Sequence, residues 1–303
     1  MSDDRDRALP FEISLAQWSL HRTIFAGELD PLDFPRHAAE AFGINAVEYV
    51  NRCFKDRADY DSLGFIDELK KRSDDAGVRN LVIMIDREGD LGDSDELQRG
   101  RAVDNHLKYL DAAMTLGCHA IRVNARSAGS RDEQMRLAAD GLRHLGERAE
   151  PYDIRVLVEN HGGWSSDGAW LADVMKQADH PLVGTLPDFG NFCLDWERRD
   201  DPTAWYDRYR GVSELMPFAG AVSAKSNDFN DTGEEIHTDY ERMIAIVLGA
   251  GYRSAIGIEY EGEALPEAEG IRRTKALLER VGRAWADGRP GFDQPPTAGN
   301  ALT

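Results

Sequence analysis

Two hydrophobic patterns alternate along this chain of 303 residues. Short apolar runs rich in Val, Ile and Leu are typical of strands buried on both faces, and longer amphipathic stretches between them are typical of helices. The strands are predicted at 11–20, 46–50, 80–86, 119–125, 154–160, 183–189, 220–224 and 255–260. The helices are predicted at 31–42, 63–76, 97–116, 131–149, 166–178, 202–215, 238–250 and 266–286.

This alternation predicts an α/β protein built as a single (β/α)8 TIM barrel. Glycines follow several predicted helices shortly before the next strand, where glycine commonly ends a helix; they are Gly43, Gly77, Gly117 and Gly251. An open doubly wound sheet is the alternative, but no GxGxxG motif follows the first strand. We expect the barrel to span 1–286, and we expect the Gly- and Pro-rich stretch 287–303 to form a flexible tail.

Polar residues stand where four of the apolar runs end: Asn124, Glu159, Asp188 and Glu259. In a parallel barrel the outgoing ends of the strands meet at one face, which carries the active site. Three carboxylates brought together in a dry pocket repel one another unless a cation lies between them. A divalent metal is the usual cation, so the pattern predicts a metal site at these strand ends.

Charge and composition restrict the partners. The formal net charge is -19, which argues against a general affinity for nucleic acid or for an anionic membrane. The first ten residues lack the apolar stretch of a secretory signal, and no run approaches the ~18 apolar residues of a membrane span. The three cysteines are scattered, as reduced thiols are. A cytoplasmic protein is expected.

Four strand-end segments carry a family resemblance: Glu159 in VLVENHGG, Asp188 in LPDFGNF, Lys225 in VSAKSNDF and Glu259 in IGIEYEG. In this order they resemble the xylose isomerase-like TIM barrel family, which contains sugar isomerases and epimerases. The resemblance implies a small-molecule sugar or sugar derivative as substrate. It also implies one divalent metal held by Glu159, Asp188 and Glu259.

The chain departs from the family pattern at two positions. Ser223 stands where relatives have a metal-binding His, and Asn191 stands where a second His is common. Oxygen ligands then dominate the site, which favours Mn or Mg over Co or Zn, with a weakly bound or absent metal as the alternative. His237 is a candidate for the missing ligand.

Glu159 and Glu259 are the candidate catalytic pair. Isomerisation or epimerisation removes a proton from the carbon next to a carbonyl and returns one nearby, so two flanking carboxyl groups can act as base and acid. A metal bound to the substrate oxygens would stabilise the enediolate. The structural alternative is that either glutamate only pairs with an arginine such as Arg122.

Lys225 ends the seventh strand, and the other candidates for binding substrate also lie at or just beyond strand ends. Lys225 could polarise a substrate oxygen or serve only as a counter-ion for the carboxylates. His161 follows Glu159 by two residues and therefore shares its side of the strand. The remaining candidates offer a flat ring or hydrogen-bonding groups to a polyol: Trp18, His21, Glu48, Asn124 and Asn191. Each of them could equally be structural.

Other functions remain open. A lyase on the same scaffold, such as a keto-polyol dehydratase or a 3-keto-glycoside eliminase, shares the removal of the α-proton. A barrel that binds sugars without turning them over fits the missing His. A DNA repair endonuclease fits poorly, because its metal cluster needs several His ligands and the chain is acidic. No Gly-rich run marks a phosphate cradle, so an unphosphorylated substrate is expected. A homo-oligomer is left open.

Overall fold

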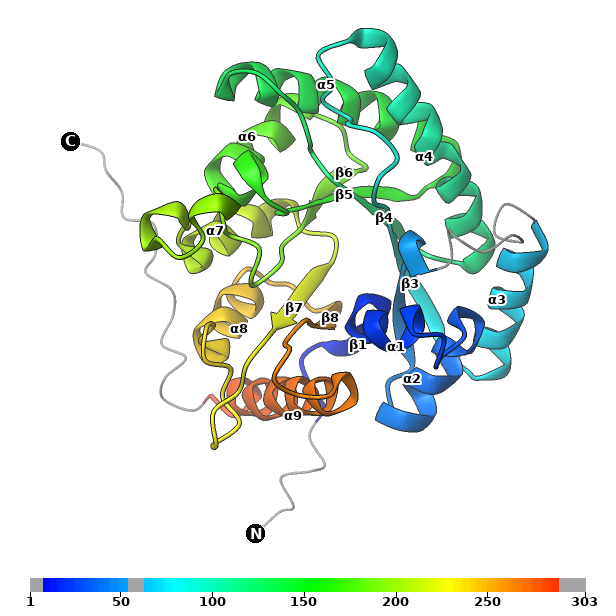
Figure 1. The fold of residues 1–303 in the computed structure, drawn as a ribbon, viewed down its shortest axis with the longest axis vertical. Helices are drawn as coiled ribbons and strands as arrows, with labels where there is room; N and C mark the ends of the chain where they lie inside the picture. Colours follow the sequence, from blue (N-terminus) through cyan, green and yellow to red (C-terminus); the bar gives the residue numbers. More distant parts are fainter. Residues whose placement is uncertain (1–7, 54–62, 289–303) are drawn as a thin grey trace.

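The strands form one parallel sheet that curls into a closed barrel, with the helices packed around it (Figure 1). This computed structural model describes residues 8–53 and 63–288. The strands are β1 (Glu12–Ala16), β2 (Ala46–Val50), β3 (Arg79–Met84), β4 (Ala120–Val123), β5 (Arg155–Glu159), β6 (Val183–Leu186), β7 (Val222–Ser226) and β8 (Ala255–Tyr260). The helices are α1 (His21–Phe25), α2 (Phe34–Phe42), α3 (Leu63–Asp75), α4 (Glu96–Leu116), α5 (Arg131–Ala149), α6 (Gly168–Ala178), α7 (Arg208–Leu215), α8 (Tyr240–Gly249) and α9 (Glu267–Ala286).

The strand order closes the barrel. Neighbouring strands pair in the order β6-β5-β4-β3-β2-β1-β8-β7. The two outer strands of that series are joined by parallel bridges between Thr185 and Ala219 and between Asp188 and Ser223. The predicted (β/α)8 TIM barrel is therefore confirmed. The part of the predicted tail 287–303 that begins at residue 289 lies outside the described residues.

Local signals in the sequence end and begin the helices where the barrel needs a turn. Gly43, Gly77, Gly117 and Gly251 all have positive φ angles, between 63° and 86°, which a residue without Cβ adopts without strain. Polar side chains accept hydrogen bonds from the first backbone N–H groups of five helices; these caps are Asp95, Ser130, Asp167, Asp207 and Asp239. The ends of these helices are therefore set by local residues at the helix termini.

Two predicted elements are wrong in part. The first strand, predicted at 11–20, ends at Ala16, and Gln17–Leu20 forms a 3-10 turn. The Ser19 hydroxyl bonds there to strand β8, donating to the Ile258 carbonyl at 3.0 Å and accepting from the Tyr260 N–H at 2.9 Å. The Ser19 hydroxyl thus satisfies two backbone groups of β8 that a longer first strand would otherwise have bonded. The backbone of Gln17–Leu20 can therefore turn at the rim of the barrel.

The predicted helix at 202–215 is also interrupted. Pro202–Ala204 forms a 3-10 turn, Trp205 is extended, and α7 begins only after the Asp207 cap. The backbone N–H of Tyr206 donates to the carbonyl of Phe192, which ties this stretch to the loop after β6. A contact with a distant segment has overridden the local helical pattern.

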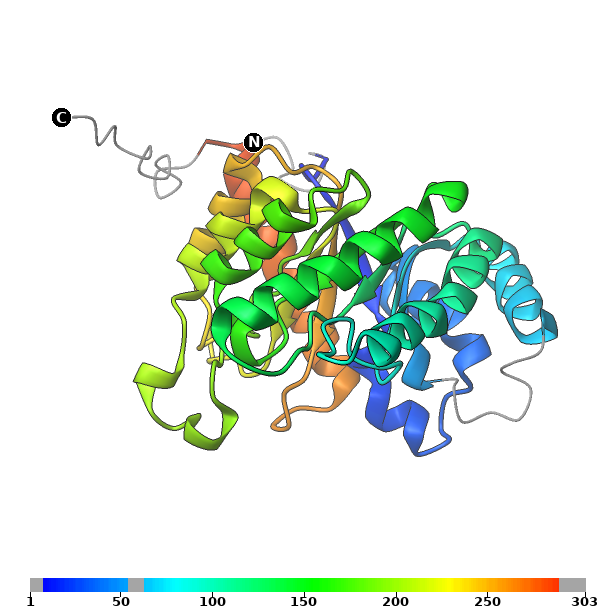
Figure 2. The ribbon, with the colours of Figure 1, turned by 90° about the horizontal axis from the view of Figure 1, so that it is seen from above.

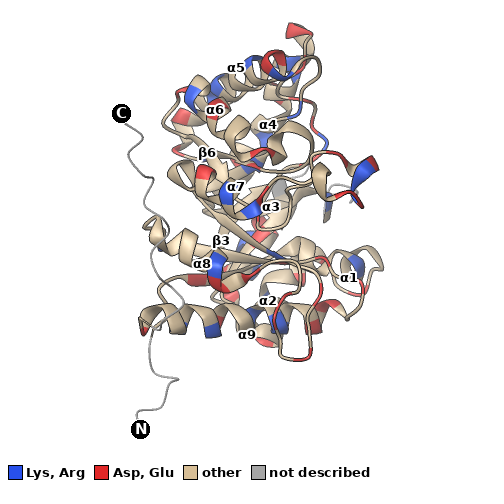
Figure 3. Ribbon diagram, turned by 90° about the vertical axis from the view of Figure 1, so that its left-hand side faces the viewer, with Lys and Arg blue, Asp and Glu red and all other residues tan. Residues whose placement is uncertain are grey.

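The two faces of the barrel differ. Figure 2 shows that the long loops after β6 and β8 project from the same side of the molecule, which is the side toward which β1 runs. Acidic and basic residues are interspersed over the outer helices (Figure 3). Within the described residues, no helix is long and apolar enough to cross a membrane. The expected cytoplasmic location stays a prediction.

Candidate functional site

Three buried carboxylates meet at the outgoing ends of the strands. Glu159 is the last residue of β5, Asp188 lies two residues beyond β6, and Glu259 is the next-to-last residue of β8. One carboxylate oxygen from each lies within 4.8 Å of the other two. The convergence expected from the strand ends is present in the structure.

Asp188 is held rigidly but keeps one oxygen free. Its Oδ1 accepts from the backbone N–H groups of Gly190 and Asn191, both at 2.8 Å, and its own N–H donates to the side-chain oxygen of Asn160. Its Oδ2 is buried without a hydrogen-bond partner in the described residues. Burial raises the pKa of Asp188 to about 6, although the Lys225 ammonium acts in the other direction. Such an oxygen needs a proton or a cation.

Glu159 is fixed from two sides. The Nε of Arg122 lies 2.8 Å from one carboxylate oxygen, and the amide of Asn191 donates to the other at 2.9 Å. Arg122 also bonds to Asp86 at 2.8 Å, so the guanidinium bridges two carboxylates. Burial raises the pKa of Glu159, and Arg122 opposes that rise. The ion pair considered as a structural alternative is thus present, and it also orients Glu159 beside Asp188 and Glu259.

Glu259 and Lys225 form the other half of the site. Ser223 donates to Glu259 at 2.9 Å, and the Lys225 ammonium lies 3.8 Å from Glu259 and 3.2 Å from Glu261. Burial raises the pKa of Glu259 well above its usual range. Burial alone would lower the pKa of Lys225, but the carboxylates of Asp188 and Glu259 hold it well above normal. Lys225 is therefore charged.

The charges of the site do not balance, and this favours a further cation. Two buried cations, Arg122 and Lys225, face five carboxylates: Asp86, Glu159, Asp188, Glu259 and Glu261. Excess buried carboxylate is costly unless a proton or a metal neutralises it. The unpartnered Asp188 oxygen and the all-oxygen donor set fit Mg or Mn. The residues present thus fit a divalent metal.

His237 does not belong to this donor group. Its Nε2 lies 3.1 Å from the Asp228 carboxylate, and both side chains are exposed. The group of potential ligands within the described residues comprises Glu159, Asp188 and Glu259. The candidate replacement for the missing His is therefore engaged elsewhere.

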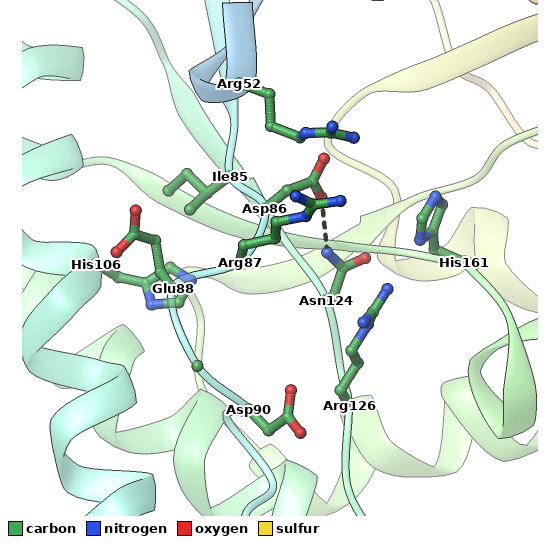
Figure 4. A pocket seen from close by; sticks show the side chains of 11 residues that line it. Arg52, Ile85, Asp86, Arg87, Glu88, Asp90, His106, Asn124, Arg126 and His161 are labelled. Atoms are coloured by element: carbon green, nitrogen blue, oxygen red, sulfur yellow. Dashed lines mark hydrogen bonds between the residues drawn. The ribbon is translucent and has the colours of Figure 1, made fainter. Parts of the chain in front are cut away.

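The predicted substrate-binding residues are distributed around two hollows. Asn124 and His161 line a cavity of about 220 Å³ at the ends of β3 to β5 (Figure 4). Asn191 and Lys225 line a larger cleft of about 870 Å³ beside the loops after β6 and β8. Their roles in binding substrate stay predictions. Burial lowers the pKa of His161 to about 4, so this ring is neutral at physiological pH.

Trp18 and His21 lie on the first-strand side of the mouth. Their rings stack with centroids 4.6 Å apart, and the Trp18 side chain helps to lower the pKa of Glu261, the partner of Lys225. The His21 ring lies 2.6 Å from the Trp18 carbonyl and 3.6 Å from Glu267 at the start of α9. The structure therefore connects Trp18 to the site, whereas His21 packs behind it.

Glu48 lies inside the barrel. It accepts from Ser14 at 2.6 Å, and a Cβ at position 257 would come within 2.5 Å of its carboxylate, so only Gly257 leaves room for it. Burial raises the pKa of Glu48 to about 7. The structure does not place it on either of the two hollows, and its contact with substrate stays a prediction.

Replacing Glu48 by Gln is expected to stabilise the protein at alkaline pH. The folded chain holds a proton on Glu48 up to about pH 7, whereas the unfolded chain releases it near the ordinary value of 4.5. The free energy of unfolding therefore falls as pH rises through this window, by ~3 kcal/mol at most. Urea unfolding should show Glu48→Gln matching the wild type at pH 4 and exceeding it at pH 8. An equal difference at both pH values would contradict the assignment; the exposed Glu40→Gln is the control.

Two groups of polar residues at the mouth were not singled out from the sequence. Glu261 follows Glu259 by two residues, so the alternation that places His161 beside Glu159 also indicates Glu261. Arg52, Arg87 and Arg126 come two or three residues after β2, β3 and β4 and line the smaller cavity. These arginines lie in loops, where the sequence has no hydrophobic periodicity. Only their short distance from the strand ends could have indicated that they line the mouth of the barrel.

Restoring the imidazole of the family pattern is expected to change metal selectivity. Ser223 contacts Glu259 directly, so a His at this position would face the candidate ligands. Ser223→His should bind Zn or Co more tightly relative to Mg, since imidazole is the softer ligand. Titration of each metal with calorimetric detection measures this ratio. An unchanged ratio would show that position 223 does not reach the metal.

Comparison with known proteins places the chain in a family. No curated protein matches it. A sugar phosphate isomerase/epimerase from Parabacteroides distasonis is 15% identical with a TM-score of 0.68, covering 91% of this chain and 95% of that one. A xylose isomerase-like TIM barrel protein from Mycobacterium smegmatis, in complex with magnesium, is 16% identical with a TM-score of 0.65, covering 94% and 99%.

A third solved structure, the 3-keto-D-glucoside 4-epimerase from E. coli, is 15% identical with a TM-score of 0.63, covering 90% of this chain and all of that one (100%). At such identities these likenesses support the fold alone. The family model described as xylose isomerase-like TIM barrel matches residues 36–281, which is most of the chain. The chain therefore belongs to the xylose isomerase-like TIM barrel family.

Proposed function

We propose that the protein is a sugar isomerase or epimerase that moves a proton through an enediolate, assisted by one divalent metal. The observation that carries this proposal is the meeting of Glu159, Asp188 and Glu259 at the outgoing face of the barrel, within 4.8 Å and buried. The magnesium of the Mycobacterium smegmatis relative and the epimerase activity of the E. coli relative are consistent with it.

Glu159 and Glu259 are the acid and base. Glu159, beside Arg122, acts as a carboxylate that takes the proton from the carbon next to the substrate carbonyl. The electrons of that C–H bond form the double bond of the enediolate, and the charge moves to the former carbonyl oxygen. Glu259 then delivers a proton to the opposite face of the same carbon, which gives the epimer. Delivery to the former carbonyl carbon, with the neighbouring hydroxyl proton moving to the charged oxygen, gives the isomer. The roles reverse in the reverse reaction.

Charged neighbours supply the electrostatic part of catalysis. The Lys225 ammonium, 3.8 Å from Glu259, is placed to stabilise charge on a substrate oxygen. Asp188, with its free Oδ2, together with Glu159 and Glu259, would hold the metal. When bound, such an ion acts as a Lewis acid toward the substrate carbonyl and hydroxyl. Because these groups are buried away from water, the electrostatic interactions among them are stronger than they would be at the surface.

Product analysis distinguishes the proposed reaction from its rivals. Ketoses, aldoses and 3-keto-glucosides are incubated with the Mn-loaded protein, and the products are identified by chromatography and NMR. An isomer or epimer of the starting sugar is the expected product. A dehydrated sugar or a released aglycone would instead assign a lyase.

A sugar-binding barrel without turnover is the second candidate. Arg122 and Lys225 already place positive charge beside the carboxylates, so the site has a partial substitute for a metal. Elemental analysis after gentle purification tests this candidate. Protein that contains no metal and takes up none from added Mn, yet binds a sugar, would favour it over the enzyme.

A further inference from the structure

Three arginines line the 220 Å³ cavity at the mouth of the barrel. Arg52, Arg87 and Arg126 follow the adjacent strands β2, β3 and β4, and their side chains point into the same space (Figure 4). None forms an ion pair with an acidic residue in the part of the chain that the structure describes, although acidic residues outnumber basic ones by 55 to 36. Three guanidinium groups that share one cavity and have no carboxylate partner among the described residues give that cavity an unmatched positive charge.

The carboxylates on this cavity do not neutralise the arginines. Asp86 is engaged by Arg122 and by the amide of Asn124, at 2.8 and 3.0 Å. Glu88 accepts from the Tyr109 hydroxyl at 2.7 Å and lies 3.7 Å from the Lys108 ammonium. Asp90 is exposed at the rim. Arg52 also lies over the rings of Trp18 and Phe25, 5.1 and 5.9 Å from their centroids, a contact that leaves its N–H groups free to donate. Among the described residues, the three guanidinium groups therefore have N–H groups available to a ligand.

Unpartnered polar atoms beside the cavity favour a polar ligand. The buried Nδ1 of His161 and the buried Oδ1 of Asn124 both lack hydrogen-bond partners within the described residues. Buried polar atoms without partners are costly unless a ligand or water satisfies them.

Size and position connect the cavity to the reaction site. Its volume of about 220 Å³ is smaller than the ~300–1,000 Å³ that enclose a whole ligand, so it fits one end of a substrate. Asp86 on its wall shares Arg122 with Glu159, and His161 lies two residues beyond Glu159. A neighbouring hollow of about 370 Å³ shares Asp90, Arg126 and His161 with it. The cavity therefore lies next to the carboxylates at the same mouth of the barrel.

We propose that this cavity binds an anionic end of the sugar substrate, a carboxylate or a phosphate, through the guanidinium groups of Arg52, Arg87 and Arg126. That the substrate is a sugar rests on the proposed function. That it carries an anionic group rests on the cavity alone. A carboxylate agrees with the expectation of an unphosphorylated substrate, whereas a phosphate would overturn that expectation, which considered only Gly-rich phosphate cradles. Guanidinium groups bind either oxyanion in a forked geometry without such a loop.

A matched set of probes tests the inference without requiring turnover. D-glucose, D-glucuronate and D-glucose 6-phosphate differ only at the terminal carbon, and inorganic phosphate reports the anion alone. Calorimetric titration at low ionic strength, with Mn present, should show at least one anionic sugar binding about tenfold or more tightly than glucose. Tighter binding of D-glucuronate would identify a carboxylate as the anionic group, and tighter binding of D-glucose 6-phosphate would identify a phosphate. Added salt should reduce the preference.

A double variant assigns the preference to the arginines. Arg87→Gln/Arg126→Gln removes two exposed charges that have no ion-pair partner among the described residues, so the fold should be retained. It should bring the affinity for the anionic sugar to within about twofold of that for glucose. Arg272→Gln, which removes one exposed charge from α9, should leave the preference unchanged.

Three results would overturn the inference: equal affinity for glucose and both anionic sugars, no binding of any anion at millimolar concentration, or a preference that survives in the double variant. Failure of the proposed function would look different. Anion binding through the arginines with no isomer or epimer formed from any anionic sugar would leave the cavity assigned and the reaction rejected.

Discussion

Glu159→Gln and Glu259→Gln are each expected to lower turnover by at least ~10²–10⁴-fold, the contribution of a general base alone. The amide keeps the shape of the side chain and one oxygen for a metal, but it cannot exchange a proton with carbon. Steady-state rates of the Mn-loaded variants measure the loss, and metal content measured on the same samples separates lost chemistry from lost metal.

The control for these variants is Glu263→Gln. Glu263 is an exposed residue of the loop after β8 that lines the larger cleft outside the carboxylate group, so its replacement should leave the rate nearly unchanged. Near-normal turnover in both Glu159→Gln and Glu259→Gln would reject the two-glutamate mechanism. The proton transfers would then have to be sought at His161 and Lys225.

Asp188→Asn is expected to weaken Mn binding by ~100-fold or more while leaving the fold intact. Groups that only orient ligands are worth ~10–100-fold in affinity, so a direct ligand should cost at least as much. The amide removes the charge at nearly constant volume and replaces one of the two carboxylate oxygens by an NH₂ group. Oδ2, the oxygen that has no partner in the described residues, is the one offered to the metal. Calorimetric titration of Mn and elemental analysis measure the effect.

A matched Asp→Asn change at a different place in the mouth controls for the lost charge. Asp228 lies on the larger cleft and pairs with His237, so Asp228→Asn should retain Mn affinity. Circular dichroism of both variants checks the fold. Unchanged Mn affinity in Asp188→Asn would remove Asp188 from the ligand set and leave the buried carboxylates to be neutralised by protons and by Lys225.

Much of the fold could be predicted because its signals are local. The apolar run predicted at 154–160 contains the strand Arg155–Glu159, and the glycines predicted to end helices have the left-handed angles that the role requires. The errors arise where distant contacts decide. Ser19 turns the backbone at Gln17–Leu20 by bonding to β8, and the tie between Tyr206 and Phe192 interrupts the predicted helix at 202–215.

The candidate site divides in the same way. The convergence of Glu159, Asp188 and Glu259 follows from their positions at strand ends together with a rule about barrels. The partner of each carboxylate does not follow, because it depends on which side chain reaches across from a neighbouring strand. Arg122 joins Glu159 to Asp86 across three strands, and Lys225 lies between Glu259 and Glu261.

Deuterium exchange with solvent also tests whether Glu159 and Glu259 act on different faces of the substrate. In an epimerase with one base for each face, each Gln variant should still exchange deuterium from one epimer only. The face that remains active identifies the glutamate that serves it. Loss of exchange from both epimers in both variants would indicate that the two residues act together on one face.

Solvent exchange tests the central claim most directly. The Mn-loaded protein is incubated in D₂O with keto- and aldo-sugars, 3-keto-glucosides and their anionic derivatives, and the carbon next to the carbonyl is followed by NMR. The account predicts that deuterium enters at this carbon for at least one sugar, and that Glu159→Gln/Glu259→Gln abolishes the exchange. Isomer or epimer formed in D₂O without any solvent deuterium at that carbon, and at an undiminished rate in the double variant, would contradict it.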